Sequence, residues 1–273
     1  MIARLVTVSS LALVTAAAAH AAGPEETTAQ APVMAPAPAP ERPRLVFTLR
    51  GGVAASPEYF GSDEYAVGPD LGFRLDYLSL GNGRSVGNLD PWAERTGLNF
   101  RGSFRYIRER DTGDFDELAG LDDIDAAFEV GGAISYGTEN FATFVEARRG
   151  FGGHEGWVGE IGADAILRPT ERLRLSVGPR LLFGDDTYTD TYFGVTPAES
   201  SAALGAYDPD GGMVSAGVEF GARYKISDLW GLEGAITYDK FTEDAADSPI
   251  IEQGEDEQWG IRFGVTRVFS IGG

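Results

Sequence analysis

Hydrophobic and polar residues alternate along most of the chain. Phe100 and Phe104, for example, alternate with Arg101 and Arg105. A period of two predicts a β-strand with one apolar face, because successive side chains of a strand point to opposite faces. Ten segments follow this pattern: 45–54, 71–77, 98–106, 128–136, 141–148, 157–167, 173–181, 214–224, 230–239 and 259–266.

Segments of about ten residues, apolar on one face and small or charged on the other, are typical of transmembrane β-strands. We therefore predict an all-β, antiparallel transmembrane barrel of 10–12 strands. Twelve is favoured, because Leu78 and Leu80 continue the alternation and Asn82-Gly83 is a turn sequence. The same alternation also fits a soluble β-sandwich or a lipocalin-like barrel, whose interior would be apolar.

Three features favour the membrane alternative. Short and long connections alternate along the chain, as in outer-membrane barrels, and the N-terminus resembles a secretory signal. Aromatic residues cluster at the strand ends, as interfacial girdles require; they are Tyr77, Tyr106, Tyr136, Trp157, Tyr224, Trp230, Tyr238 and Trp259.

The composition divides the chain into four parts. Residues 1–21 are predicted to be a signal peptide, since a basic start and an apolar run precede Ala19-His20-Ala21. Residues 22–44 are rich in Ala and Pro and are expected to form a periplasmic spacer. The barrel is expected over 45–269, followed by a disordered C-terminal overhang at 270–273.

Short turns are expected in the periplasm and long loops outside, which places both termini in the periplasm. The outside segments 56–66, 108–125, 150–156, 184–212 and 242–258 hold 25 acidic and 2 basic residues, of a chain with net charge −20. Such a chain is not expected to bind nucleic acid. The acidity is usually that of a solvated surface; the alternative is divalent-cation binding, although the carboxylate-rich segment 111–117 lacks the spacing of an EF-hand loop.

The inward face of the barrel is predicted to be charged with both signs. Ion pairs across so small a lumen would close it, whereas an open pore is the alternative. The charges expected there include Arg101, Arg105, Glu129, Glu160, Arg180, Glu219 and Arg223.

The sequence contains few candidates for catalytic residues. The chain has no cysteine and no Gly-x-Ser-x-Gly sequence, and His154 is the only histidine beyond the predicted signal peptide. A nucleophilic enzyme needs an activated nucleophile with a positioned base. We therefore expect no enzyme, no cofactor and no metal; an outer-membrane lipid-modifying enzyme is the least favoured alternative.

Four loop segments resemble motifs of one family, the MipA/OmpV outer-membrane proteins. The first-loop segment holds Gly61, Ser62 and Asp63, and the Gly-rich loop holds Gly153 and His154. The long-loop segment holds Tyr192, Phe193, Gly194 and Val195, and the last-loop segment holds Asp247, Ser248 and Pro249.

The resemblance extends over about residues 45–269 and implies a protein of the cell outer membrane without known catalytic residues. Some members are described as scaffolds that bring a murein polymerase and a lytic transglycosylase together. Others are described as osmoregulated or adhesive surface proteins. The partners implied are therefore outer-membrane lipid and lipopolysaccharide, together with those murein enzymes. The chain differs from the family at its end, where Phe269 is followed by four further residues.

Overall fold

One antiparallel sheet curls around a central lumen. The computed structural model describes residues 43–81 and 83–272, and all strands lie within the unit Glu41–Gly273. The predicted signal peptide, all of the predicted spacer except its last two residues, and Asn82 of the predicted turn lie outside the described residues.

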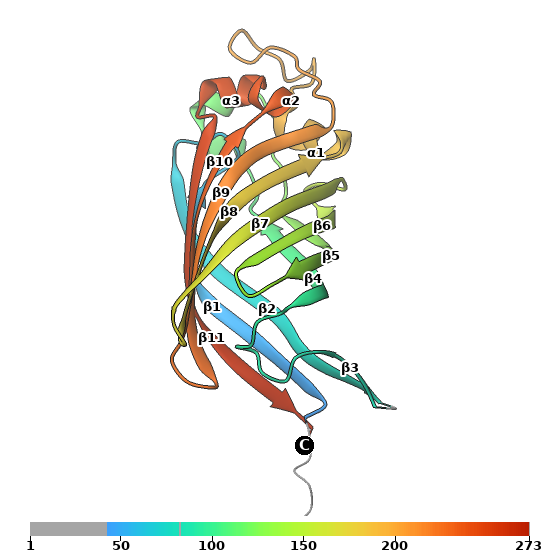
Figure 1. Ribbon diagram of the computed structural model, residues 1–273. Coiled ribbons are helices and arrows are strands. Elements are labelled where there is room, and N and C mark those ends of the chain that lie inside the picture. The colour runs from blue at the N-terminus through green and yellow to red at the C-terminus, as the bar shows by residue number, and fades with distance from the viewer. Residues whose placement is uncertain (1–42, 82, 273) are drawn as a thin grey trace, which may run out of the picture. The chain divides into compact units, whose positions relative to one another are not determined.

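Eleven strands occur in the described part of the chain (Figure 1). They are β1 (Leu45–Pro57), β2 (Tyr65–Gly81), β3 (Arg84–Gly87), β4 (Gly97–Ile107), β5 (Ala127–Gly137), β6 (Phe141–Gly152), β7 (Trp157–Thr170), β8 (Leu173–Gly184), β9 (Gly212–Lys225), β10 (Trp230–Phe241) and β11 (Glu257–Ile271).

Short helices occupy the long connections. They are the 3₁₀ helices η1 (Thr112–Asp114) and η2 (Asp116–Leu118) and the α-helices α1 (Asp186–Phe193), α2 (Glu243–Ala246) and α3 (Pro249–Gln253). Among the residues described, no helix is both long enough and apolar enough to cross a membrane.

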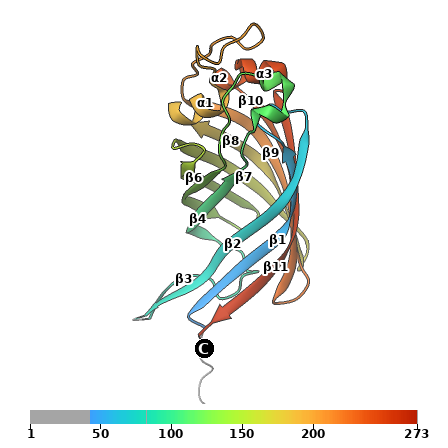
Figure 2. The ribbon, with the colours of Figure 1, turned by 180° about the vertical axis from the view of Figure 1, so that it is seen from behind.

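Chain neighbours pair with each other, and β1 pairs with β11, so the sheet order is β3-β2-β1-β11-β10-β9-β8-β7-β6-β5-β4. The strands β3 and β4, which end this order, do not pair with each other. Figure 2 shows β3 beside the end of β2, with β4 apart from it. The barrel is therefore nearly closed, with one unpaired seam.

The apolar and charged residues of the alternating segments lie on the faces expected from the sequence, with apolar side chains outside and charged side chains inside. Phe100 and Phe104 are 65% and 63% exposed on the outside, whereas Glu129 on the neighbouring strand is fully buried inside. Large apolar side chains cover the outer wall on most of the strands, and the lumen contains charged groups. A sheet with this inside-out distribution is suited to lipid. The soluble alternative, which requires an apolar interior, is excluded.

The strand count lies within the expected range but differs from the favoured twelve. The chain does turn after β2, where Gly83 adopts φ +75°, and pairs back as β3. This strand ends after four residues at Gly87, which adopts φ +86°. Pro91 follows and has no N–H for a strand ladder. The stretch before β4 therefore forms no twelfth strand.

The expected overhang at 270–273 is wrong in its first half. The strand β11 continues to Ile271, and its register pairs Ser270 with Val46 and Ile271 with Leu45. The ladder continues because β1 begins at Leu45 and supplies backbone partners for both residues. Phe269 is thus an interior residue of the last strand, stacked on Phe47 with ring centroids 5.3 Å apart.

Candidate functional site at the covered end of the barrel

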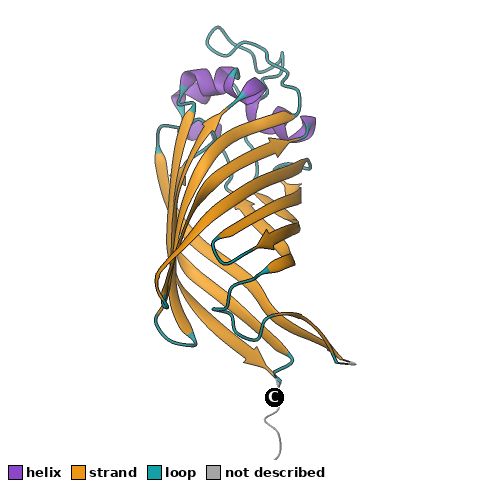
Figure 3. Ribbon diagram, in the orientation of Figure 1, coloured by secondary structure: helices purple, strands orange, loops and turns teal. Residues whose placement is uncertain are grey.

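The long loops fold over one end of the barrel into a cap. The helices α1, α2 and α3 gather there, as Figure 3 shows. Two buried apolar clusters hold the cap together. One contains Ile124, Val158, Tyr188, Tyr192, Phe193, Val214, Phe241, Ala245 and Ile251, and the other contains Tyr59, Leu118, Leu121, Val195, Leu204 and Ile250.

The long-loop and first-loop motifs meet through aromatic rings. Tyr192 and Phe193, at the end of α1, are buried. Phe60 stacks on Phe193 with centroids 5.8 Å apart and meets Tyr192 edge-on at 5.0 Å. Aromatic pairs in these geometries are favourable beyond the area that they bury. The two motifs therefore form one packed unit, although they are about 130 residues apart in the chain.

The last-loop motif joins this unit through Ser248. Its hydroxyl donates to the backbone carbonyl of Phe193 at 2.6 Å and accepts from the N–H of Ile250 at 3.2 Å, which caps α3. Pro249 is the first residue of that helix, where its missing N–H costs nothing. Asp247 lies at the end of α2, where its N–H donates to the carbonyl of Glu243.

Glycine is required where the first loop meets α3. Gly61 adopts φ +97°, a conformation that side chains disfavour, and its carbonyl accepts from the N–H of Glu255 at 2.8 Å. Ser62 follows it and is buried, with its hydroxyl accepting from the N–H of Glu64. Asp63, in contrast, is exposed and belongs to the solvated surface.

The remaining long-loop residues direct the chain away from α1. Gly194 ends the helix, and its N–H donates to the carbonyl of Asp190 at 3.1 Å. Val195 is buried and forms a backbone bridge with Tyr207. These contacts bring the far side of the same loop back over the cap.

The Gly-rich loop places His154 under α1. The imidazole lies edge-on to Tyr188 and Tyr192, with ring centroids 5.1 and 5.5 Å away. Its Nε2 is 3.4 Å from Oε1 of Glu129, and both side chains are fully buried. A side chain at Gly153 would collide with the backbone of Asp125. The histidine therefore connects the cap to the barrel wall.

Burial moves the titration of the cap's phenols further above neutral pH. It raises the pKa of Tyr188 and, together with the neighbouring charges, that of Tyr192. A tyrosine hydroxyl is already protonated at neutral pH at its ordinary pKa of about 10, so both phenols stay neutral. The buried His154 thus faces the carboxylate of Glu129. Among the described residues, no nucleophilic side chain contacts both of them.

Beneath the cap, charged side chains cross the lumen. Arg148 lies between three carboxylates, with Nε 2.7 Å from Glu129, a direct contact with Glu146, and Nη1 3.5 Å from Glu160. Arg101 reaches Glu146 at 3.0 Å. Buried pairs of this kind need each other, since an unpaired charge there would be strongly destabilising.

The other predicted lumen charges lie on the inner face too. Arg180 and Glu219 are 3.1 Å apart, and Arg223 lies 3.1 Å from Glu233. Arg105 is close enough to Glu129 for the two charges to act on each other. The structure thus gives most of these groups a partner of opposite charge.

The chain segment 88–96 lies against lumen side chains near the short turns, a placement that the alternation of residues does not predict. Trp92 lies over the guanidinium of Arg223 at 4.4 Å, and its indole N–H donates to the carbonyl of Asp228 at 2.9 Å. Glu94 pairs with Arg168 at 2.6 Å. The available signal was an isolated Trp next to Pro91 in a connection too polar for a strand.

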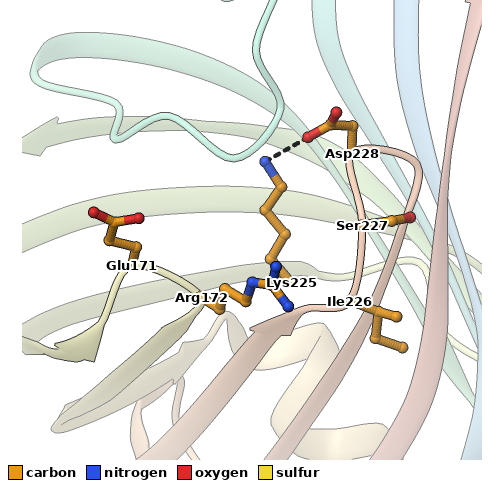
Figure 4. Close-up of a pocket in the computed structure, with 6 residues that line it drawn as sticks. All are labelled: Glu171, Arg172, Lys225, Ile226, Ser227 and Asp228. Carbon is orange, nitrogen blue, oxygen red and sulfur yellow. Dashed lines mark ion pairs between the residues drawn. The ribbon is translucent and has the colours of Figure 1, made fainter.

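The opposite end of the barrel carries the short turns. Figure 4 shows a shallow pocket there, between the β7–β8 turn and the β9–β10 turn. Glu171 and Arg172 come from the first turn, and Lys225, paired with Asp228 at 2.8 Å, comes from the second. This end thus presents charged groups of both signs close together.

The acidic cap shows no arrangement typical of a cation site. Within the residues described, no three His, Cys, Asp or Glu side chains gather as they would around a metal ion.

Two acidic side chains of the cap have shifted pKa values. Burial, together with Asp208 and Asp186, raises the pKa of Asp190. Hydrogen bonds from Thr112 lower that of Asp123.

A family model described as "MltA-interacting protein MipA" matches residues 49–269. The chain belongs to the MipA family. The match covers every strand of the barrel in whole or in part, and it includes all four loop motifs that meet in the cap.

One curated relative of this MipA-family chain is "Putative outer membrane protein YiaT" of Escherichia coli (strain K12). It is 31% identical over 103 residues, which are 37% of this chain and 40% of the relative. The chain thus spans about two fifths of the length of the curated relative that it matches. Together with the inside-out distribution of side chains, these findings identify an outer-membrane β-barrel of the MipA family.

Two solved structures have a low overall likeness to this chain. OprG from Pseudomonas aeruginosa is 11% identical with a TM-score of 0.29, over 84% of this chain and 97% of that one. The Neisserial surface protein A is 12% identical with a TM-score of 0.28, over 81% of this chain and 96% of that one.

Proposed function

We propose that this MipA-family barrel is a non-enzymatic scaffold of the outer membrane that binds a lytic transglycosylase, and with it a murein polymerase, at its short-turn end. The observation that carries the proposal is that packed side chains lie at three levels of the barrel. The cap lies over one end, the ion pairs around Arg148 cross the lumen beneath it, and the segment that holds Trp92 reaches Arg223 near the short turns. A barrel with such contacts across its lumen is better suited to binding a partner on its surface than to conducting solutes through a channel.

The family description supports the identity of the partner, since it refers to interaction with MltA. Lytic transglycosylases and murein polymerases act on murein, which lies in the periplasm. The partner must therefore meet the end of the barrel that faces the periplasm. Short turns face the periplasm in outer-membrane barrels. The two turns shown in Figure 4 therefore form the proposed docking surface.

The chemistry of this surface fits a polar, reversible interface. Arg172 and Lys225 lie on adjacent turns, joined by a hydrogen bond from the N–H of Lys225 to the carbonyl of Arg172 at 2.8 Å. Exposed charges at an interface contribute mainly to association rate and specificity. Reversing them should weaken binding without unfolding the barrel.

The test is a binding measurement with purified lytic transglycosylase and the refolded barrel. The double variant Arg172→Glu/Lys225→Glu should bind at least about tenfold more weakly, since each lost charge contact contributes about 1 kcal/mol. Lys240→Glu is the matched control, because Lys240 is also an exposed, ion-paired lysine but lies at the capped end. Equal binding by the double variant and the wild-type protein would refute the docking surface.

A passive pore is the second candidate, and it makes an opposite prediction. If the interior opens in the membrane, the refolded protein should give steady conductance steps in a planar bilayer. The scaffold proposal expects none from the wild-type protein.

A further inference from the structure

Along the seam of the barrel, β2 and β4 face each other without pairing, and a side-chain contact lies at each end of this stretch. We call the stretch between the two contacts the slit. At the capped end, Arg108 after β4 pairs with Glu58 after β1, Nη1 to Oε2 at 2.7 Å. At the short-turn end, Arg95 donates from Nη2 to the carbonyl of Leu75 on β2 at 3.0 Å. Between these two contacts, the facing edges of β2 and β4 have no strand partner among residues 43–81 and 83–272.

An unpaired strand edge is costly in a membrane, because hydrocarbon cannot satisfy its N–H and C=O groups. The slit therefore favours an occupant whose polar atoms meet the strand edges and whose apolar chains lie on the outer wall. Apolar side chains flank the slit on that wall, with Phe73 on β2 68% exposed and Phe100 on β4 65% exposed. A phospholipid combines both kinds of group.

The accessible charge beside the slit is positive. Arg101, Arg95 and Arg74 have side chains that are 46%, 31% and 29% exposed. Their carboxylate partners are less accessible, with Glu233 at 17%, Glu146 at 7% and Asp76 at 1%. The three arginines are also close enough for Arg74 and Arg101 to repel the charge of Arg95. An anionic group is the ligand that this arrangement would attract.

We propose that the slit between β2 and β4 binds an anionic phospholipid from the leaflet next to the short turns, with its phosphate at Arg95 and Arg101. Its headgroup and ester oxygens meet the strand edges, and one acyl chain lies on the outer wall beside the slit, against Phe73 and Phe100. Arginine is suited to this role because its planar guanidinium can donate two hydrogen bonds to one phosphate. The choice of leaflet rests on the orientation given under the proposed function.

The experiment is native mass spectrometry of the detergent-solubilised barrel with phosphatidylglycerol or phosphatidylcholine of the same acyl chains. The wild-type protein should retain phosphatidylglycerol in preference. Arg95→Gln and Arg101→Gln should each lower that retention about fivefold, as expected for one arginine near an anionic headgroup. Heat-modifiable mobility of each variant on a gel verifies that the barrel has folded.

Arg262→Gln is the matched control. Arg262 also belongs to the lumen, is 38% exposed and pairs with one glutamate at 2.9 Å, but it lies on β11, away from the slit. It should bind lipid like the wild-type protein. Equal retention of the two lipids, or folded Arg95→Gln and Arg101→Gln variants that bind like the wild-type protein, would overturn the proposal.

A photoreactive acyl chain on phosphatidylglycerol locates the site. After detergent extraction, adducts should map to the peptides that carry Phe73 and Phe100, and adducts spread evenly over the wall would contradict the slit. Neither readout involves the transglycosylase, so the lipid site and the scaffold can fail independently.

Discussion

His154 and Glu129 lie 3.4 Å apart, Nε2 to Oε1, with both side chains fully buried between the cap and the barrel wall. Glu129 also accepts from Nε of Arg148 at 2.7 Å. One carboxylate thus connects the loop that carries the histidine to the ion pairs of the lumen. Cap and lumen are therefore coupled through this residue.

Replacing Glu129 should be costly. Glu129→Leu leaves the buried Arg148 with one carboxylate fewer, and the loss of one partner from a buried pair costs about 3–5 kcal/mol. Denaturant unfolding of the refolded barrel measures this change. The double variant Glu129→Leu/Arg148→Met should lose less stability than the two single variants together, and strict additivity would show that the two side chains do not interact.

The cap should loosen when Phe193 is truncated. Phe193 is fully buried, and a Phe→Ala change in such a site costs about 3–5 kcal/mol. Protease should then cleave the loop 194–211 faster, while the barrel keeps its heat-modifiable mobility. Thr187→Ala is a control on the exposed face of the same helix, and equal sensitivity of both variants would contradict the packed cap.

The stability of the cap should depend on the protonation of Asp190. Its raised pKa means that the carboxylate form is disfavoured in the folded cap, first by burial and then by Asp208 and Asp186. This cost is present at neutral pH and is relieved as the pH falls through the raised pKa. Asp190→Asn should therefore increase protease resistance at pH 7, and the difference from the wild-type protein should shrink as the pH falls.

Asp123 provides the opposite case. Its pKa is lowered by hydrogen bonds from Thr112, so its contribution is present at neutral pH and is lost as the pH falls through that lowered value. Asp123→Asn should decrease protease resistance at pH 7. Changes of the same sign in the two variants would contradict the assigned environments.

The C-terminal strand should need its last two residues. Ser270 and Ile271 pair with Val46 and Leu45, so deleting 270–273 removes part of the ladder that joins β11 to β1. The amount of heat-modifiable barrel in the outer membrane should fall. A protein that ends at Ile271 is the control and should assemble normally, whereas normal assembly of both would show that this pairing is dispensable.

The register of β4 can be examined with spin labels. Labels at Phe100 and Phe104 should be accessible to a lipid-soluble relaxing agent, because both side chains are on the outer wall. Labels at Arg101 and Arg105 should be protected from it. The reverse pattern would indicate a shift by one residue, which exchanges the two faces of a strand.

The sequence was sufficient for the features that depend on local pattern. Alternation around Phe100 and Arg101 determined the strand and its faces, because the period of two is a property of the extended backbone. Turn chemistry at Gly83 correctly indicated that the chain reverses after β2. These inferences require no knowledge of which distant residues meet.

Long-range packing could not be predicted in the same way. The contact of Phe60 with Phe193, the bond from Ser248 to the carbonyl of Phe193, and the position of Trp92 over Arg223 join segments far apart in the chain. No spacing in the sequence encodes them. The family motifs drew attention to four loop segments, but only the folded cap shows that these segments pack against one another.

The docking of a lytic transglycosylase at the short turns is tested most directly by photocrosslinking in the intact envelope. A photoreactive side chain replaces Glu171 or Asp228 at the short-turn end, and Lys240 or Asp256 at the capped end. The scaffold account predicts a covalent adduct with the transglycosylase from 171 and 228 and none from 240 and 256. Adducts from the capped end alone, or no adduct from any position in a correctly assembled barrel, would contradict it.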